Sequence, residues 1–249
     1  RGPMIRAVIF DLWGTLIYDD PDVGEQRSQL RLRSARDTLA AFGHAYDPAD
    51  IEAAFLAAGT ELARIHGTER DISTRGRTVL YMRHLDESLA GQLDDDAWRL
   101  LDEAILTPAL THRPPMLPGA VDVLAKIKSR DLRAGLISNT GITPGIVLSR
   151  ILSDMGLMPH LDLAVFSDEL EIAKPALAIF EHALDELGLA PEEAVFVGDQ
   201  PVLDVLGARR AGMWMVQIGD LAAEGAEPHA RIDALDELLP ALRSLDLID

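Results

Sequence analysis

The chain has 249 residues, of which 48% are apolar, and its 41 acidic and 23 basic side chains give a formal net charge of −18. This acidic balance excludes binding to nucleic acid or to an anionic membrane, because both need basic patches. The sequence contains no apolar run of about 18 residues that would cross a bilayer. It also contains no cysteine, which excludes disulfides, thiolate metal sites and a cysteine nucleophile.

The length is sufficient for a sizeable core, in one large domain or two modest ones. No basic, apolar leader precedes the first predicted strand, and together with the missing cysteines this predicts a cytoplasmic protein. The tripeptide Arg1-Gly2-Pro3 before Met4 is interpreted as the remnant of an expression tag.

Five short apolar runs end abruptly at polar residues, and they cover residues 7–10, 134–137, 163–166, 194–197 and 213–218. Runs without alternation are typical of strands that are covered on both faces, and helix-length amphipathic segments lie between them. This order predicts a doubly wound, Rossmann-like parallel sheet of the α/β class. The carboxyl ends of such strands meet at one edge, where ligands bind. Asp11, Ser138, Asn139 and Asp199 are therefore expected to converge there.

The segment after the first strand has a different pattern. Helical runs are predicted at residues 23–42, 48–66, 74–90 and 95–110, and no buried strand interrupts them. A stiff, proline-containing stretch at 111–119 then returns to the sheet. We therefore predict an all-helical domain at residues 20–111, inserted into a core made of residues 4–19 and 112–249.

Four ordered motifs lie at the predicted strand ends and loops: Ile9-Phe10-Asp11-Leu12-Trp13-Gly14-Thr15-Leu16, then Ser138-Asn139, Lys174-Pro175 and Val197-Gly198-Asp199. Their order and spacing resemble the motifs of the haloacid-dehalogenase-like hydrolase superfamily. The helical insertion after the first motif is similar to the C1 cap of that superfamily. A single match would be weak, whereas four in order are specific.

The resemblance implies a covalent mechanism for a small phosphorylated or carboxylated substrate. Asp11 would be the carboxylate nucleophile. Lys174 would cancel the repulsion between this carboxylate and the substrate, while Ser138 and the Asn139 backbone would hold phosphoryl oxygens.

The resemblance also implies a Mg²⁺ site, because this ion prefers oxygen ligands. The ligands would be Asp11, the main-chain oxygen of Trp13 and Asp199, with Asp204 assisting in the outer shell. Two of these residues also have a purely structural interpretation. Asp204 could be a first-turn acid of the next helix, and Ser138 could cap a turn.

Trp13 stands where phosphatases of the superfamily have a second Asp as general acid. Its indole has no usable proton, so acid–base steps should suffer while ion and phosphate binding survive. The leading hypothesis is a Mg²⁺-dependent phosphatase. The alternatives are a metal-independent 2-haloacid dehalogenase and a non-catalytic protein that binds Mg²⁺ and phosphate. The dehalogenase pattern also lacks the second Asp, but it has a Tyr where this chain has Phe180, and it lacks the retained Gly198-Asp199.

Trp13 is also expected to contact the substrate and to close the site against the helical domain. Asp19 and Asp20 follow the first motif, and they are either a substitute proton donor or, more simply, two exposed turn acids. The pattern leaves both a monomer and a homodimer open.

Overall fold

A computed structural model of the protein describes residues 4–249, and the interpreted tag remnant lies outside this range. Six strands form one fully parallel sheet in the order β3-β2-β1-β4-β5-β6. The strands are β1 (Ala7–Phe10), β2 (Arg133–Ser138), β3 (Leu163–Phe166), β4 (Ala194–Gly198), β5 (Trp214–Ile218) and β6 (Ala230–Ile232). This sheet with its flanking helices confirms the predicted α/β class.

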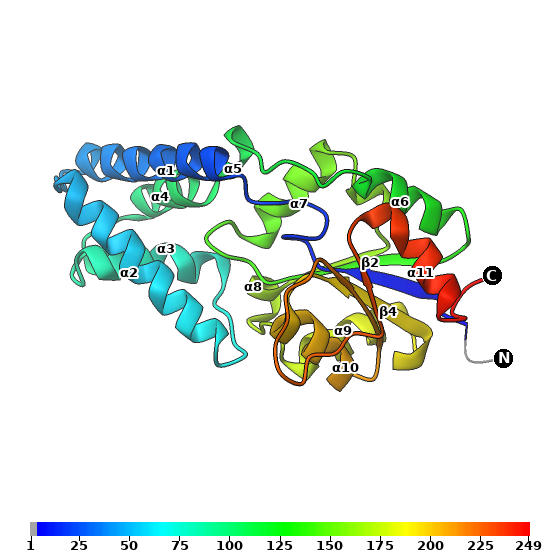
Figure 1. Cartoon of the computed structure of the whole chain (residues 1–249). Helices are drawn as coiled ribbons and strands as arrows, with labels where there is room; N and C mark the ends of the chain where they lie inside the picture. The colour runs from blue at the N-terminus through cyan, green and yellow to red at the C-terminus, as the bar shows by residue number, and fades with distance from the viewer. Residues whose placement is uncertain (1–3) are drawn as a thin grey trace.

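The central strand β1 is buried on both faces, as its uninterrupted apolar sequence predicts. Val8 and Phe10 pack into one hydrophobic cluster, whereas Ala7 and Ile9 pack into another on the opposite face. The first face is covered by α6 (Ala120–Lys128), α7 (Gly145–Asp154) and α11 (Leu238–Ser244), and the second by α9 (Leu177–Leu187) and α10 (Gly207–Arg210) (Figure 1). The sheet is therefore shielded from water on both sides, and its carboxyl edge stays available for ligands.

A separate helical lobe, residues 21–106, follows β1 and lies beside the carboxyl edge of the sheet (Figure 1). It consists of α1 (Pro21–Ala41), α2 (Pro48–His66), α3 (Thr74–Leu85) and α4 (Asp95–Leu106). Its core contains side chains from all four helices, among them Leu39, Ala58, Leu80 and Leu101. The lobe thus has a hydrophobic core distinct from the two clusters on the sheet.

Two local predictions were wrong, and two short elements were not predicted. Helix α3 ends at Leu85 because Asp86 adopts an extended conformation and bonds the backbone of Ser88. Pro108 has no N–H to donate, so the predicted helix at 95–110 is divided into α4 and the short α5 (Pro108–Thr111). The short helix α8 (Ser167–Leu170) directly follows β3 and was not predicted. Strand β6 was missed because three residues give no readable pattern.

The remaining helical turns are short. They are η1 (Leu89–Gly91), η2 (Met158–His160), η3 (Pro191–Glu193), η5 (Leu235–Glu237) and the π-helical η4 (Pro201–Leu206). Among the helices that residues 4–249 form, none is both long and apolar enough to span a membrane.

Two backbone contacts connect the helical lobe to the sheet domain. The chain leaving the sheet pairs with the chain returning to it at Ile17 and Met116. The loop between α2 and α3 lies against the segment that precedes Lys174, where Asp71 N–H donates to Glu171 O over 3.0 Å. The Ala173 N–H donates in turn to Glu69 O over 3.1 Å. The lobe is therefore bonded directly to the loop that carries Lys174.

Candidate active site

Asp11 is the first residue beyond β1, at the middle of the sheet's carboxyl edge. Its N–H donates to Val197 O of β4 over 2.8 Å, which continues the strand pairing up to the site. The turn that follows needs glycine at position 14, because φ is +78° there. A Cβ at Gly14 would also lie 2.5 Å from Asp199 Oδ2. The Gly14 backbone is thus packed directly against the Asp199 carboxylate.

Lys174 lies at the centre of the site and is only 1% exposed. Its Nζ donates to Asp11 Oδ1 over 2.6 Å and to Asp204 Oδ1 over 2.7 Å. Asn139, after β2, fixes the backbone of this lysine from both sides. The Asn139 amide donates to Lys174 O over 3.0 Å, and Asn139 Oδ1 accepts from Lys174 N–H over 2.7 Å. Residues that are distant in sequence therefore converge, as predicted from the strand ends.

The electrostatics of the site are dominated by burial and by excess negative charge. Burial raises the pKa of Asp11 to about 7, assisted by Asp204 and Asp199 and opposed by Lys174. Burial lowers the pKa of Lys174, but Asp11 and Asp204 outweigh it, so the net pKa is raised and the ammonium stays charged. One ammonium group thus compensates three neighbouring carboxylates only in part.

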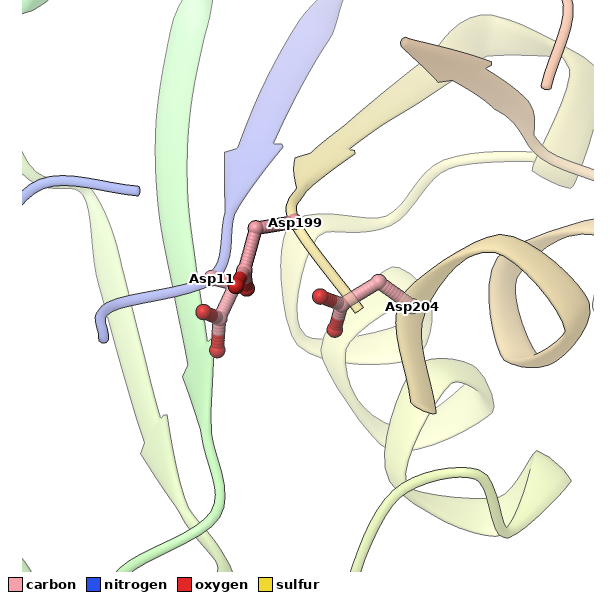
Figure 2. Close-up of side chains that lie close together, drawn as sticks. All are labelled: Asp11, Asp199 and Asp204. Atoms are coloured by element: carbon pink, nitrogen blue, oxygen red, sulfur yellow. The ribbon is translucent and has the colours of Figure 1, made fainter. Parts of the chain in front are cut away.

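The three carboxylates of Asp11, Asp199 and Asp204 each place an oxygen within 4.8 Å of the other two. Figure 2 shows them around one space beside the strand ends. Asp199 Oδ2 accepts from Gln200 Nε2 over 2.6 Å, but Asp199 Oδ1 is buried and has no hydrogen-bond partner among residues 4–249. A buried carboxylate oxygen without a donor is costly. The donor set and this unpartnered oxygen fit a divalent cation with oxygen ligands.

Asp204 lies in the first turn of η4, as the structural alternative predicts, but it is fully buried and contacts Lys174. Its Oδ2 accepts from Gln200 N–H over 2.9 Å, and its Oδ1 accepts from Lys174. A Cβ at Gly198 would collide with the Asp204 carboxylate, so glycine is required at the end of β4. Asp204 is thereby held against Lys174 by both the backbone and the ammonium group.

Ser138 is the last residue of β2 and is buried. Its hydroxyl donates to Asn139 O over 3.2 Å. The neighbouring strand β1 leads to Asp11, so Ser138 and Asn139 occupy the same edge as the nucleophile predicted from the sequence. Asn139 is half-buried there, whereas the Ser138 side chain is fully withdrawn from solvent.

A cleft of about 530 Å³ opens between this edge and α1 of the helical lobe. Trp13 and Asn139 line its core side, and α1 supplies most of the opposite side. Trp13 is half-buried, and the guanidinium carbon of Arg27 on α1 lies 5.8 Å from its ring centroid. The volume is that of a small-molecule pocket.

Comparison with known proteins identifies this arrangement. The sequence model of the haloacid dehalogenase-like hydrolase family matches residues 5–212. The chain belongs to this family. A phosphoglycolate phosphatase from Rhodospirillum rubrum is 31% identical over 239 residues, which cover 93% of this chain and 86% of that protein. A 2-haloacid dehalogenase from Pseudomonas syringae pv. Tomato DC3000 superposes with a TM-score of 0.70 at 25% identity, covering 97% of this chain and 100% of that chain.

A shorter match has higher identity. A glyceraldehyde 3-phosphate phosphatase from Methanothermobacter thermautotrophicus is 37% identical over 119 residues, or 48% of this chain. The matched region spans about half, 51%, of that relative's length. The resemblance predicted from the motifs is confirmed, and phosphatases and a dehalogenase both occur among the similar proteins.

The structure also places the two acids after the first motif of this haloacid dehalogenase-like hydrolase. Asp20 caps α1, because its Oδ1 accepts from the backbone of Asp22 and Val23. The mostly exposed Asp19 pairs with Arg27. Asp20 is thus a capping residue, whereas Asp19 lines the cleft and its role as a substitute proton donor stays a prediction.

Sequence reasoning missed Arg27 and Arg31, which both line the cleft. The signal was present, because they share an i, i+4 stripe with the buried Ala35 and Leu39 of α1. A charged residue on the buried stripe of a helix is a reason to suspect a site.

Proposed function

We propose that this haloacid dehalogenase-like hydrolase is a Mg²⁺-dependent phosphatase of small phosphorylated metabolites. The observation that carries the proposal is the group of three carboxylates that shares one ammonium, with Asp199 Oδ1 buried and unpartnered within residues 4–249. The ion would be held by Asp11, Asp199 and the main-chain oxygen of Trp13, with Asp204 assisting. When bound, Mg²⁺ supplies positive charge that offsets the repulsion between carboxylate and phosphate.

Lys174 holds Asp11 Oδ1 over 2.6 Å, whereas Asp11 Oδ2 accepts only a longer hydrogen bond from Thr15 Oγ1 over 3.4 Å, so Oδ2 would be the attacking oxygen. Attack forms a bond from Oδ2 to phosphorus, and the bond from phosphorus to the leaving oxygen breaks with its electron pair. Water then attacks the phosphorus of the aspartyl phosphate, which releases phosphate and restores the carboxylate. Ser138 and the backbone of Asn139 would hold the phosphoryl oxygens from the β2 end.

Trp13 cannot protonate the leaving group, because the indole N–H is a hydrogen-bond donor without a usable acid function. Missing general acid catalysis costs typically about 10²- to 10⁴-fold. Aryl or acyl phosphates depend least on a proton, so the enzyme should prefer substrates whose leaving group is already a weak base.

The helical lobe would act as the cap of this site, and the boundaries at residues 20 and 111 stay a prediction. Relatives named as phosphatases of phosphoglycolate and glyceraldehyde 3-phosphate support a small phosphorylated substrate. The position of α1 beside the cleft supports a role of this helix in substrate selection.

Dehalogenation of a 2-haloacid is the second candidate, and two observations favour it. Trp13 stands at the position of the general acid, and a departing halide needs no proton from such an acid. A 2-haloacid dehalogenase also superposes over 97% of the chain. The retained Asp199, with its unpartnered oxygen, favours the phosphatase instead.

The test is hydrolysis of 4-nitrophenyl phosphate with Mg²⁺ or with a chelator, beside chloride release from 2-chloropropionate. Parent activity on the phosphate that requires both Mg²⁺ and Asp11, and is lost in Asp11→Asn, supports the proposal. Chloride release that continues in the chelator supports the dehalogenase and contradicts the phosphatase.

Two further variants sharpen the test. A silent parent with an active Trp13→Asp variant would identify an intact phosphatase site that binds without turnover, as in the non-catalytic alternative. Calorimetric Mg²⁺ binding should be lost in Asp199→Asn. It should persist in the matched control Asp220→Asn, because Asp220 follows β5 at the same edge but is exposed.

A further inference from the structure

The first helix of the lobe presents two arginines where a helix normally presents apolar residues. Arg27 and Arg31 are 7% and 5% exposed, and they lie one turn apart on the buried stripe of α1. Fully buried arginines are rare unless they are paired, because burial removes the hydration of the charge. Their position therefore needs a compensating partner.

The protein supplies only part of that compensation. Arg27 Nη2 is paired with the exposed Asp19, and Arg31 Nε donates to Ile105 O over 2.7 Å. Arg27 Nη1 and Arg31 Nη2, however, are buried and have no hydrogen-bond partner within residues 4–249. Each guanidinium group thus has one buried nitrogen without a hydrogen-bond acceptor, and an additional acceptor would satisfy it.

Both side chains line the cleft whose opposite side carries Trp13 and Asn139. The two cations also disfavour each other: the pKa of Arg31 is lowered to about 10, chiefly by burial and additionally by Arg27, against an opposing effect of Tyr81. The cleft lining also contains two acidic residues, Asp19 and Glu25, so the arginines would attract a ligand through their unmet donors rather than through an excess of positive charge. An anion in the cleft would relieve both the repulsion and the unmet donors.

We propose that Arg27 and Arg31 bind a second anionic group of the substrate, a carboxylate or a second phosphate, at the end remote from the phosphoryl group that is transferred. The inference rests on the proposed phosphatase function and narrows its substrate class to phosphate esters with two separate negative groups. The planar guanidinium fork suits both kinds of oxyanion.

The transferred phosphoryl group is not the expected partner of these arginines. Lys174 is the cation in contact with Asp11, and no ion pair within residues 4–249 connects either arginine to Asp11, Asp199 or Asp204. The two sets of cations therefore form separate sites, one at the sheet edge and one on α1.

The test compares 3-phosphonopropionate with its amide, which differ only in the remote charge and cannot be hydrolysed at the carbon–phosphorus bond. Calorimetry with Mg²⁺ should show that the parent binds the carboxylate about ten- to a hundredfold more tightly, the effect of a charge-assisted hydrogen bond. Propane-1,3-bisphosphonate is the second arm. Tighter binding of the bisphosphonate than of the carboxylate identifies a phosphate as the second group, and the reverse identifies a carboxylate.

Arg27→Gln and Arg31→Gln should each move the ratio of the two affinities toward one. Arg33→Gln, an equal loss of charge at an exposed position of the same helix, should keep the parent ratio. Equal affinity of the parent for both ligands overturns the inference even if a variant does not fold. A preference that survives in folded Arg27→Gln and Arg31→Gln variants overturns it as well.

Failure of the proposed function gives a different result. If 4-nitrophenyl phosphate is hydrolysed with Mg²⁺ but the two phosphonates bind equally, the phosphatase stands and the second anion site is wrong. If neither phosphonate binds and no phosphate ester is hydrolysed, the phosphatase proposal fails, and the inference that rests on it fails with it.

Discussion

Two buried clusters of charge lie on either side of the junction between sheet and helical lobe, and they are built differently. The site cluster consists of Asp11, Lys174, Asp199 and Asp204 at the carboxyl edge of the sheet. The junction cluster consists of Asp71, Arg77, Thr140 and Ser167, where the loop before α3 and α3 itself meet the segments after β2 and β3. The charged residues of both clusters are almost completely withdrawn from water, except Asp199, which is half-buried.

In the junction cluster Asp71 pairs with Arg77, and its Oδ1 also lies 3.0 Å from Nε2 of His66. The buried Asp168 joins the cluster by accepting from Thr140 Oγ1 over 3.0 Å. Arg77 Nη2 donates to Asp71 Oδ2 over 2.9 Å and to Thr140 Oγ1 over 2.6 Å, and Arg77 Nε donates to Gly141 O over 2.6 Å. Ser167 Oγ donates to Asp71 Oδ2 over 2.5 Å. No side-chain atom of Asp71 or Arg77 is among the buried, unpartnered atoms of residues 4–249.

The site cluster has the opposite character, since three carboxylates share one ammonium and Asp199 Oδ1 is unpartnered within the described chain. In the junction cluster Asp71 and Arg77 find all their partners within the protein, and these contacts hold the lobe in position. In the site cluster a buried oxygen lacks a partner, which a ligand could supply. Whether a buried charged group has all its partners therefore distinguishes residues that support the fold from residues that bind a ligand better than the extent of burial does.

The largest expected effect is on the junction cluster. Arg77→Leu removes the guanidinium and leaves the buried Asp71 with His66 as its remaining basic neighbour, so the free energy of unfolding should fall by about 3–5 kcal/mol. Urea denaturation measures this change. Arg83→Leu is the control, because Arg83 lies on the same helix but pairs with Glu61 at the surface, where such a pair contributes less than about 1 kcal/mol. Equal losses of unfolding free energy in Arg77→Leu and Arg83→Leu would show that the junction cluster contributes no more to stability than a surface ion pair.

The next effect is on the site cluster and is catalytic. Lys174→Met should lower kcat/KM for 4-nitrophenyl phosphate at saturating Mg²⁺ by roughly 10²- to 10³-fold, the cost of one charge-stabilising donor. The exposed Lys126 on α6 provides the matched Lys126→Met control, which should retain parent activity. Full activity in Lys174→Met would place the chemistry elsewhere.

The site cluster could be predicted from the sequence, because regular apolar patterns mark the strands that carry it. Apolar runs that end in Asp11, Ser138 and Asp199 predicted neighbouring strand ends, and the sheet order places β2, β1 and β4 side by side. The convergence of the site cluster follows from that topology, because parallel strands share a carboxyl edge.

The junction cluster and the arginine pair of α1 lay outside those patterns. Arg77 is buried by contacts with Thr140 and Gly141, which are more than 60 positions away, and no local periodicity encodes such a partner. Arg27 and Arg31 were detectable only as charges on a buried stripe, a signal that conflicts with ordinary amphipathic patterning. Strand β6 depends on pairing with β5 rather than on its own three residues.

The smallest predicted effect is a gain in the free energy of unfolding, opposite in sign to the loss expected from Arg77→Leu. Burial raises the pKa of Asp199, assisted by Asp204, so ionised Asp199 costs stability in the folded state at pH 8. In chelator, Asp199→Asn should therefore raise the free energy of unfolding by about 1 kcal/mol, a common gain when a site is relieved of strain. The gain should shrink on acidification, because protonation removes the same charge from the parent.

Thermal unfolding of Asp199→Asn beside Asp220→Asn measures this effect, and the exposed Asp220 should leave the midpoint nearly unchanged. Added Mg²⁺ should raise the midpoint of the parent and of Asp220→Asn, but not that of Asp199→Asn, because only the first two retain the carboxylate proposed to bind the ion. A destabilised Asp199→Asn variant in chelator would mean that this carboxylate supports the fold as Asp71 does. The site cluster would then be structural, and its unpartnered oxygen would no longer argue for a bound cation.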